Sequence, residues 1–319
     1  MKQVIIVPRN GYLNRLQAMA SASLLAESLG ADFSVCWLPQ AAAPAPQEVV
    51  FASDSELRFI TESELERTLG FSVESFPHYV NSHDVSEIGR VITLAGHDLG
   101  EQPLMSDFAQ ALHAGKSESV VIVAGGRFSM NSGSQPVTWD SVDFRNDRST
   151  WYRTLELAPQ IDSAWSGLIG EPFIGLHLRY SDRSHQTPSR SEIKRAVINL
   201  CRSTGIDRVF VASDSRKERE HWCEILSGLG LFPWVVENDF VSHAEFTGDV
   251  LALIDWRILA AAQATVYFAE SSFGYEAAVA SGNFDQSVAL SPNVLLSLGV
   301  RVRAIARSLL GAPRRRGWL

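Results

Sequence analysis

Short apolar runs alternate with segments of helical periodicity along most of the chain, and this alternation limits the fold more than any other feature. At the amino end, QVIIVP predicts a buried strand, NRLQAMASASLLAESLG predicts a helix that closes at Gly30, and DFSVCWL predicts a second strand. Strands joined through helices pair in parallel, because a right-handed crossover returns the chain to the same edge of the sheet. The pattern therefore predicts an α/β fold.

The second half of the chain repeats this alternation more regularly. Strands are predicted at residues 172–180, 208–213, 234–237 and 265–269, and helices at about 190–203, 216–229, 248–263 and 273–281. In the first half, further strands are predicted at EVVFA, RVITLA and SVVIVAGG, a short helix in TESELERTLG that begins at a Ser or Thr cap, and a loop over about residues 128–150.

A chain of 319 residues with 45% hydrophobic content is long enough to bury two cores of ordinary size. We therefore predict two Rossmann-like domains whose parallel sheets face a cleft. The predicted domains span residues 1–160 and 161–295, followed by a C-terminal helix and basic tail at residues 296–319.

Charge and cysteine content exclude several classes of protein. The 28 Lys and Arg residues against 36 Asp and Glu residues give a net charge of -8, which argues against a protein that reads nucleic acid over a broad surface. Three widely spaced cysteines, Cys36, Cys201 and Cys223, indicate neither a disulfide framework nor a zinc site. No secretory signal or membrane span is evident, so we expect a soluble, cytoplasmic protein. No HExxH or DxD pattern indicates a catalytic metal.

The stretch FIGLHLRYSDR begins as an apolar strand and ends in charged residues. Its period of two puts His177 and Arg179 on one face and predicts that the opposite face is core. Both lie near the carboxyl end of the strand, where open parallel sheets bind ligands. The Arg179 guanidinium matches a phosphate or carboxylate, although a structural ion pair with Asp182 or Asp214 is an equal alternative on these residues alone.

Asp255 lies within an apolar helix face in DVLALIDWRILAAAQA. A carboxylate there is costly unless something donates hydrogen bonds to it, and guanine offers two adjacent N–H donors. For a single Asp, a structural role as a loop cap or as a partner of Arg257 is the commoner alternative, and we favour it on this evidence.

Two strand-to-helix junctions complete the set of candidate sites. In ESSFGYEAAVAS, Ser271 and Ser272 lie at a helix start, where hydroxyls, free N–H groups and the helix dipole suit an anion, although Ser as a plain N-cap is commoner. In PRNGYLNRL, Gly11 lies in the turn and Asn14 and Arg15 open the helix. There we favour Asn14 as a helix cap.

Taken in order, GYLNRLQAMASASLLAESLG, FIGLHLRYSDR, RVFVASDSRKE and DWRILAAAQATVYFAESSFGYEAAVAS resemble the nodulation, α1,6- and peptide O-fucosyltransferase superfamily of two-domain GT-B glycosyltransferases. The four segments are similar to its G-x-x-N-R, H-x-R-x-x-D, A-[ST]-D and D…SSF motifs. The second motif departs from some relatives, because Tyr180 stands where they have a second Arg, and Thr187 stands where one branch has Glu.

This resemblance implies an inverting, metal-independent transfer of L-fucose from GDP-fucose, with no other cofactor. It implies that Arg179 holds the diphosphate and assists its departure, that His177 and Asp255 recognise guanosine, and that Asn14 reaches the sugar or acceptor. It further places Asp182, Asp214, Ser271, Ser272 and Phe273 in the nucleotide-sugar site, and Gly11, Asn14 and Arg15 on the acceptor side, in the first domain. The general base is unassigned, with Asp182 and an acidic residue of the amino half as candidates.

Two matters stay open at the level of sequence. The alternatives to a fucosyltransferase are a non-catalytic nucleotide- or glycan-binding protein of the same fold and a transferase that uses another sugar nucleotide. The acceptor is a glycan, a lipid-linked sugar, a peptide or a small molecule. In the Arg-rich end RVRAIARSLLGAPRRRGWL, we expect a helix that packs on the amino domain, and we assign residues 313–319 at most weak contact with anionic lipid.

Overall fold

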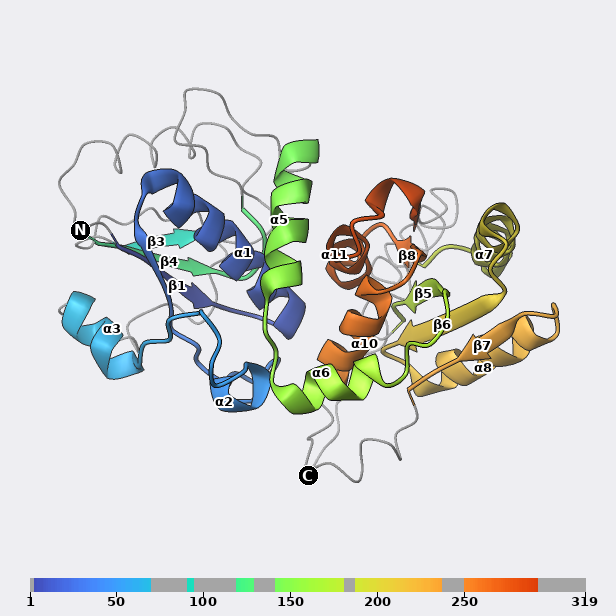
Figure 1. The fold of residues 1–319 in the computed structure, drawn as a ribbon, viewed down its shortest axis with the longest axis horizontal. Helices are drawn as coiled ribbons and strands as arrows, with labels where there is room; N and C mark the ends of the chain where they lie inside the picture. Colours follow the sequence, from blue (N-terminus) through green and yellow to red (C-terminus); the bar gives the residue numbers. More distant parts are fainter. Residues whose placement is uncertain are drawn as a thin grey trace, which may run out of the picture. The chain divides into compact units, whose positions relative to one another are not determined.

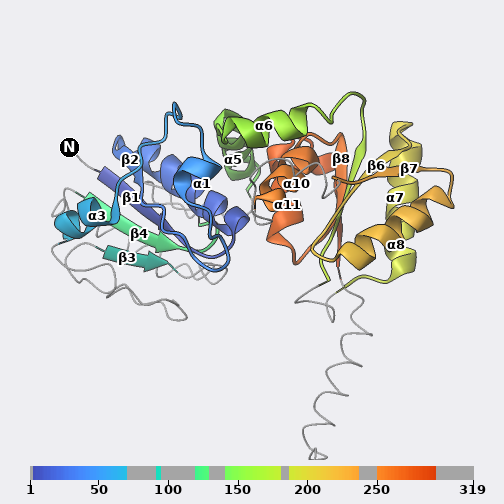
Figure 2. The ribbon, with the colours of Figure 1, turned by 90° about the horizontal axis from the view of Figure 1, so that it is seen from below.

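The structure is a computed structural model, and it describes residues 3–69, 91–94, 119–128, 141–180, 187–236 and 250–291. The chain forms two compact units (Figures 1 and 2). The first unit comprises Met1–Gly170, Val236–Ala261 and Glu276–Phe284, and the second comprises Glu171–Val235, Ala262–Tyr275 and Asp285–Leu319. The units interleave along the chain, and the domain limits at residues 160 and 295 stay a prediction. The predicted helix and tail at 296–319 lie outside the described residues.

The first unit contains a four-stranded parallel sheet in the order β2-β1-β4-β3. Its strands are β1 (Gln3–Pro8), β2 (Asp32–Val35), β3 (Val91–Leu94) and β4 (Ser119–Ala124). Helix α1 (Tyr12–Leu29) connects β1 to β2 and ends at Gly30, whose φ of 58° is the left-handed conformation that glycine adopts without strain. The predicted strand–helix–strand opening is confirmed.

Further helices of the first unit are α2 (Gln47–Val50), α3 (Glu62–Leu69), α5 (Val142–Thr154), α6 (Pro159–Ser166) and α10 (Leu251–Ala260). Thr61 caps α3 reciprocally with Glu64: the Thr61 hydroxyl accepts from the Glu64 N–H at 3.2 Å, and the Glu64 carboxylate accepts from the Thr61 N–H at 2.7 Å. This capping box confirms the short helix predicted to begin at a Ser or Thr.

Two predictions in this unit are wrong. The strand predicted at EVVFA is instead the short helix α2, which follows Pro46 and buries Val50. The loop predicted over 128–150 contains α5 from Val142 onward, with Ser141 accepting from the Phe144 N–H at 3.2 Å. Its buried residues have helical spacing, but a charged Arg at one of them concealed the apolar pattern. They are Phe144, Arg148, Ser149 and Tyr152.

The second unit contains a five-stranded parallel sheet in the order β7-β6-β5-β8-β9. Its strands are β5 (Ile174–Leu178), β6 (Arg208–Ser213), β7 (Phe232–Trp234), β8 (Ala264–Phe268) and β9 (Val288–Leu290), and its helices are α7 (Arg190–Thr204), α8 (Arg216–Ser227) and the start of α11 (Ser272–Ala280). The prediction of an α/β chain with two parallel sheets is confirmed. β9 was not predicted, since three residues carry too little periodicity to detect.

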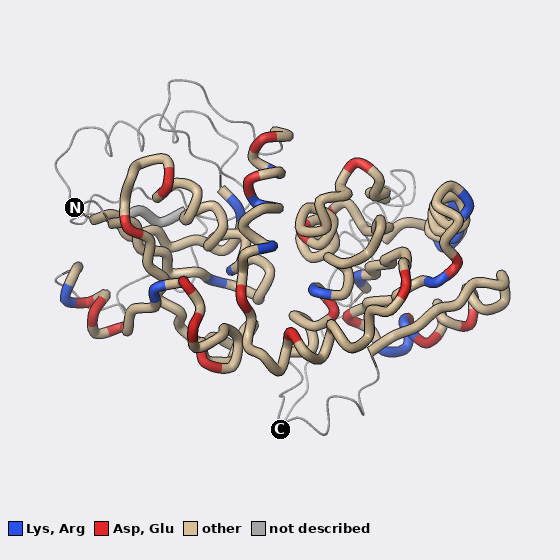
Figure 3. The backbone as a smooth tube through the Cα atoms, viewed as in Figure 1, with Lys and Arg blue, Asp and Glu red and all other residues tan. Residues whose placement is uncertain are grey.

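The two faces of β5 differ, as its alternation predicts. Ile174, Leu176 and Leu178 join a buried core with side chains of α7 and α8. His177 is on the opposite face, which contacts α11. Acidic and basic residues are interspersed on α8 (Figure 3), where Arg216 pairs with Glu220 at 2.8 Å. This helix therefore offers no surface of a single sign of charge.

Candidate functional site

The second sheet has a topological switch point between β5 and β8. The chain builds β6 and β7 on one side of β5 and then returns to place β8 and β9 on the other side. Crossovers therefore leave β5 and β8 in opposite directions, and open α/β sheets generally bind ligands at the carboxyl ends of the strands at such a point. His177 stands beside this point, opposite Ala212 of β6 and Tyr267 of β8.

His177 is a buried, neutral histidine at the switch point. Its ring is stacked on Phe273 with centroids 4.8 Å apart and planes at 16°. Burial lowers the pKa of His177 to about 3, and the nearby positive charge of Arg179 acts in the same direction while Asp214 opposes it. The ring is therefore uncharged at neutral pH, and its Nδ1 has no hydrogen-bond partner among the described residues. A buried polar atom in this state is suited to a ligand.

Gly274 allows α11 to approach the sheet, and this role was not predicted from the sequence. A Cβ at this position would lie 2.5 Å from the Cβ of Tyr267 and 2.9 Å from Nδ1 of His177. Any larger residue would therefore displace the helix or the ring. The available signal was a glycine in the first turn of a predicted helix, where it costs helix stability unless packing requires it.

Ser271 and Ser272 lie where α11 begins, as the sequence predicted. Ser271 is 1% exposed, and its backbone N–H donates to the Phe268 carbonyl at 2.8 Å. Its hydroxyl makes no hydrogen bond within the described parts of the chain, so the plain N-cap role that we considered commoner is wrong for Ser271. The hydroxyl is available at a helix N-terminus, a position that favours anions.

Asp214 and Arg179 occupy the neighbouring loops. The Asp214 carboxylate accepts a hydrogen bond from the Tyr180 N–H at 2.8 Å, which joins the ends of β5 and β6. Arg179 directly follows β5 and is half-buried. Both act on the pKa of His177, so both charges lie near its ring. The second unit thus gathers six of the predicted site residues: His177, Arg179, Asp214, Ser271, Ser272 and Phe273. Asp182 lies outside the described residues.

Asp255, by contrast, belongs to the first unit. It is half-buried on α10 beside the fully buried Ile254 and Ile258, which confirms its apolar surroundings. Arg257, its proposed structural partner, instead donates to the backbone carbonyls of Tyr152 and Leu155, and its Nε lies 3.4 Å from Asp162.

Gly11, Asn14 and Arg15 are also in the first unit, at the start of α1. The N-cap of this helix is Gly11, which makes no side-chain cap, and Asn14 lies inside the first turn. The predicted capping role of Asn14 is therefore wrong, because the extended backbone of Gly11 starts the helix three residues earlier. Arg15 is fully buried, and its guanidinium lies 4.5 Å from the ring centroid of Trp37.

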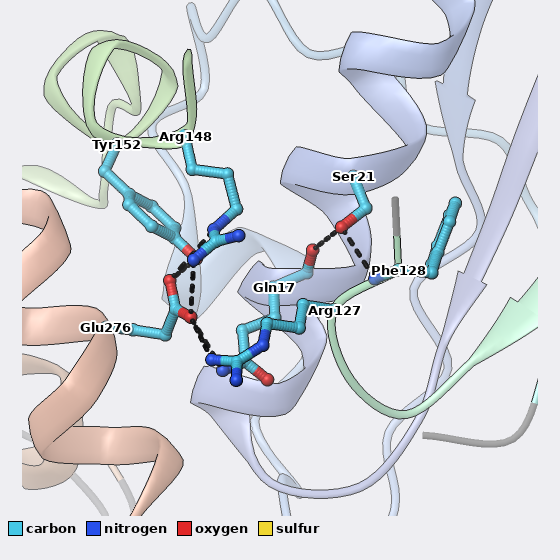
Figure 4. Close-up of polar contacts among 7 residues, drawn as sticks. All are labelled: Gln17, Ser21, Arg127, Phe128, Arg148, Tyr152 and Glu276. Carbon is cyan, nitrogen blue, oxygen red and sulfur yellow. Dashed lines mark hydrogen bonds and ion pairs between the residues drawn. The ribbon is translucent and has the colours of Figure 1, made fainter. Parts of the chain in front are cut away.

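A buried charge cluster in the first unit was not predicted (Figure 4). The Glu276 carboxylate accepts hydrogen bonds from Arg148 at 3.2 and 3.3 Å, from Tyr152 at 2.8 Å and from Gln17 at 3.1 Å, and Arg127 lies 3.4 Å away. Glu276 and Arg148 are both fully buried. The available signal was one acidic residue in the otherwise apolar helical segment GYEAAVA, since a buried carboxylate requires donors.

Among the described residues, no group of three or more His, Cys, Asp or Glu side chains could hold a metal ion. None of the helices in the described parts of the chain has the length and apolar character required to cross a membrane.

Comparison with known proteins gives likeness in structure only. No protein-family model matches the chain, and no curated protein sequence matches it. The fucosyltransferase NodZ from Bradyrhizobium is similar with a TM-score of 0.51 and 19% identity, covering 87% of this chain and 93% of NodZ. POFUT1 in complex with GDP-fucose gives a TM-score of 0.51 and 13% identity, covering 91% of this chain and 97% of POFUT1. A mutant of Arabidopsis thaliana FUT1 in complex with GDP gives a TM-score of 0.58 and 14% identity, covering 88% of this chain and 68% of FUT1.

At these identities, the likeness establishes the fold. The chain is an α/β protein with two parallel sheets, and it has the fold of the GT-B fucosyltransferases.

Proposed function

We propose that this chain is an inverting glycosyltransferase that transfers L-fucose from GDP-fucose to a hydroxyl group of an acceptor. The observation that carries the proposal is the carboxyl edge of the second sheet. There a neutral His177 stacked on Phe273 and the unpartnered hydroxyl of Ser271 meet at the N-terminus of α11. NodZ, POFUT1 and Arabidopsis FUT1, which share the fold, are described in complex with GDP or GDP-fucose.

The residues at this edge match the parts of a nucleotide sugar. A neutral imidazole forms one directed hydrogen bond with an uncharged group such as a ribose hydroxyl or a base, without attracting a counter-ion. The Ser271 hydroxyl, with Ser272, supplies polar contacts at a helix N-terminus for phosphate oxygens. Arg179 supplies a permanent charge in a planar fork that fits a diphosphate.

In the proposed reaction, the acceptor hydroxyl attacks the anomeric carbon of fucose while the bond from that carbon to the GDP oxygen breaks. GDP leaves with the bonding electrons, and Arg179 stabilises the charge that develops on the leaving phosphate. We assign Asp255 to the paired N–H donors of guanine, and Asp214 to the nucleoside pocket. Gly11, Asn14 and Arg15 are assigned to the acceptor side, and Asp182 is a candidate general base.

Calorimetry with GDP and UDP tests the nucleotide assignment. GDP should bind at least tenfold more tightly than UDP, about 1.4 kcal/mol. Asp255→Asn should remove most of this difference, since Asn lacks the second acceptor oxygen. Arg179→Lys should weaken GDP binding because a point charge cannot replace the fork. Lys217→Gln, a change at an exposed position on α8, serves as the control. Equal affinities for GDP and UDP would contradict the guanine assignment.

Donor turnover tests catalysis. Slow release of GDP from GDP-fucose without acceptor, lost in Arg179→Ala, is the expected result, whereas tight GDP binding with no turnover under any condition would indicate a binding protein. We propose that turnover needs no divalent metal, since Arg179 carries the charge that would neutralise phosphate. Activity that disappears in EDTA and returns with Mn²⁺ would contradict this part of the proposal.

A further inference from the structure

Two arginine side chains of the first unit, Arg148 and Arg15, are fully buried, and they differ in how their charge is balanced. Arg148 pairs with Glu276 at 3.2 Å. Arg15 donates from Nε to the backbone carbonyl of Asn10 at 2.9 Å, and its guanidinium lies over Trp37. Its two terminal nitrogens, Nη1 and Nη2, have no hydrogen-bond partner in the part of the chain that the structure describes. The N–H groups that suit two oxygens of an anion are thus buried without a hydrogen-bond acceptor among the described residues.

A second cation, Arg9, acts on Arg15. Burial, together with the nearby charge of Arg9, lowers the pKa of Arg15 to about 10, so the group still carries its charge at neutral pH. Arg9 is half-buried, and its Nε has no partner among the described residues either. A buried cation without an anion costs free energy, which an incoming anion would recover.

The N-terminus of α1 is a second feature that favours an anion near Arg15. This 18-residue helix has Gly11 as its N-cap, with no side-chain cap and no acidic residue in its first turn. The positive end of the helix dipole therefore has no negative group of its own in that turn. The Arg15 side chain turns back toward this end, because Nε bonds to the carbonyl of Asn10, directly before the cap. Two independent features thus converge on one location.

We propose that Arg15 and the N-terminus of α1 bind a carboxylate or phosphate group of the acceptor, so that the acceptor is an acidic rather than a neutral sugar. The conclusion that this anion belongs to the acceptor rests on the proposed function, whereas the anion site itself does not. The guanidinium edge with Nη1 and Nη2 fits two oxygens of such a group side by side. A neutral glycan would leave this charge buried and unpaired.

Because Arg15 is fully buried, an anion can enter only if a neighbouring segment moves, and we assign this movement to the segment at residues 40–45. Its Ala45 N–H donates to the Tyr12 hydroxyl at 3.1 Å, and its Ala45 carbonyl accepts from Nε1 of Trp37 at 2.9 Å. Both aromatic rings neighbour Arg15, and they are stacked with centroids 6.3 Å apart.

Binding of matched acidic and neutral sugars tests this proposal. The probes are methyl glucuronoside against methyl glucoside for a carboxylate, and glucose 6-phosphate against glucose for a phosphate. In calorimetry, at least one acidic probe should bind the wild-type chain tenfold more tightly than its neutral counterpart. Arg15→Met should abolish this preference, and Arg67→Gln, which removes an exposed charge on α3 of the same unit, should retain it. The acidic probe that binds more tightly shows whether the site prefers a carboxylate or a phosphate.

Stability provides a second readout, because Arg15→Met removes a buried unpaired charge. Its Tm should equal or exceed that of the wild type, whereas a structural arginine would give a lower Tm. Should Arg15→Met fail to fold, Arg15→Lys keeps the charge and loses the fork, and it should retain less than a tenth of the affinity. Equal binding of acidic and neutral probes, including no measurable binding of either, overturns the proposal. An acidic preference that survives in Arg15→Met also overturns it.

GDP titrations of the same variants report on the second unit and keep the two proposals separate. Intact GDP binding without an acidic preference would overturn the anion site alone. An Arg15-dependent acidic preference without GDP binding would overturn the proposed function alone, and the site would then bind acidic sugars for another purpose.

Discussion

The Glu276 cluster of the first unit and the carboxyl edge of the second sheet both bury polar side chains, but the two regions differ in hydrogen bonding. In the cluster, both oxygens of the Glu276 carboxylate have hydrogen-bond donors. Glu276 accepts hydrogen bonds from Arg148, Tyr152 and Gln17. At the sheet edge, Nδ1 of His177 and the hydroxyl of Ser271 have no partner among the described residues. Buried polar atoms with partners hold a fold together, and those without partners are costly unless a ligand completes them. The carboxylate of Glu276 is thus satisfied by other side chains, whereas the two groups at the sheet edge, like Oε1 of Gln17 within the cluster, have no partner among the described residues.

The largest effect is expected from breaking the cluster. Glu276→Gln removes the negative charge that Arg148 contacts at 3.2 Å and Arg127 at 3.4 Å, and it should lower the free energy of unfolding by about 3–5 kcal/mol. Urea denaturation measures this. Glu220→Gln is the control, since Glu220 forms an exposed pair with Arg216 that should contribute at most about 0.5 kcal/mol. A loss below about 1 kcal/mol for Glu276→Gln would contradict a structural role for the cluster.

A smaller effect is expected from filling the close contact at the sheet edge. Gly274→Ala places a methyl group 2.5 Å from the Tyr267 Cβ, and this overpacking should cost about 1–3 kcal/mol and weaken GDP binding. Elsewhere in a helix, Gly→Ala stabilises the folded protein by up to about 1 kcal/mol. A loss of stability in Gly274→Ala would therefore show that the close contact requires glycine. Gly228→Ala, where a Cβ comes no closer than 3.4 Å to another atom, is the matched control and should be neutral or stabilising. Equal effects of the two substitutions would show that α11 does not need this contact.

The smallest effect is a pH dependence that follows from the neutral His177. Its pKa is about 3 in the folded chain, against an ordinary value of about 6.5. The unfolded chain therefore takes up a proton first as the pH falls. Stability is fully present above about pH 6.5 and decreases below it, by at most about 1.4 kcal/mol per pH unit.

Urea titrations between about pH 5 and 7.5 measure this slope, and the change on His177→Gln isolates the contribution of the ring. The variant should be less sensitive to acid over this range. Identical slopes for the two proteins would show that folding does not lower the pKa of the ring, and would remove the permanently neutral histidine from the proposed site.

Much of the architecture follows from the sequence, because hydrophobic periodicity reports directly which residues are buried. It placed β1, α1, β4, β5, β6 and β8, and it identified Ile174, Leu176 and Leu178 as the core face of β5, but it placed β7 two residues too late, at 234–237 instead of Phe232–Trp234. It also placed Ser271 at a helix start. It failed for α5, where Arg148 occupies a buried position, since the periodicity argument treats a charge as exposed.

The sequence by itself determined an α/β chain with parallel strands and a strand end that carries His177 and Arg179. Only the tertiary structure decided which buried polar groups are satisfied. Glu276 receives hydrogen bonds from Arg148, 128 residues away, and from Gln17, 259 residues away, whereas Arg15 receives no acid among the described residues. The physical reason is that periodicity is local, while the partners of a buried charge come from whichever distant segments the fold brings within hydrogen-bond reach.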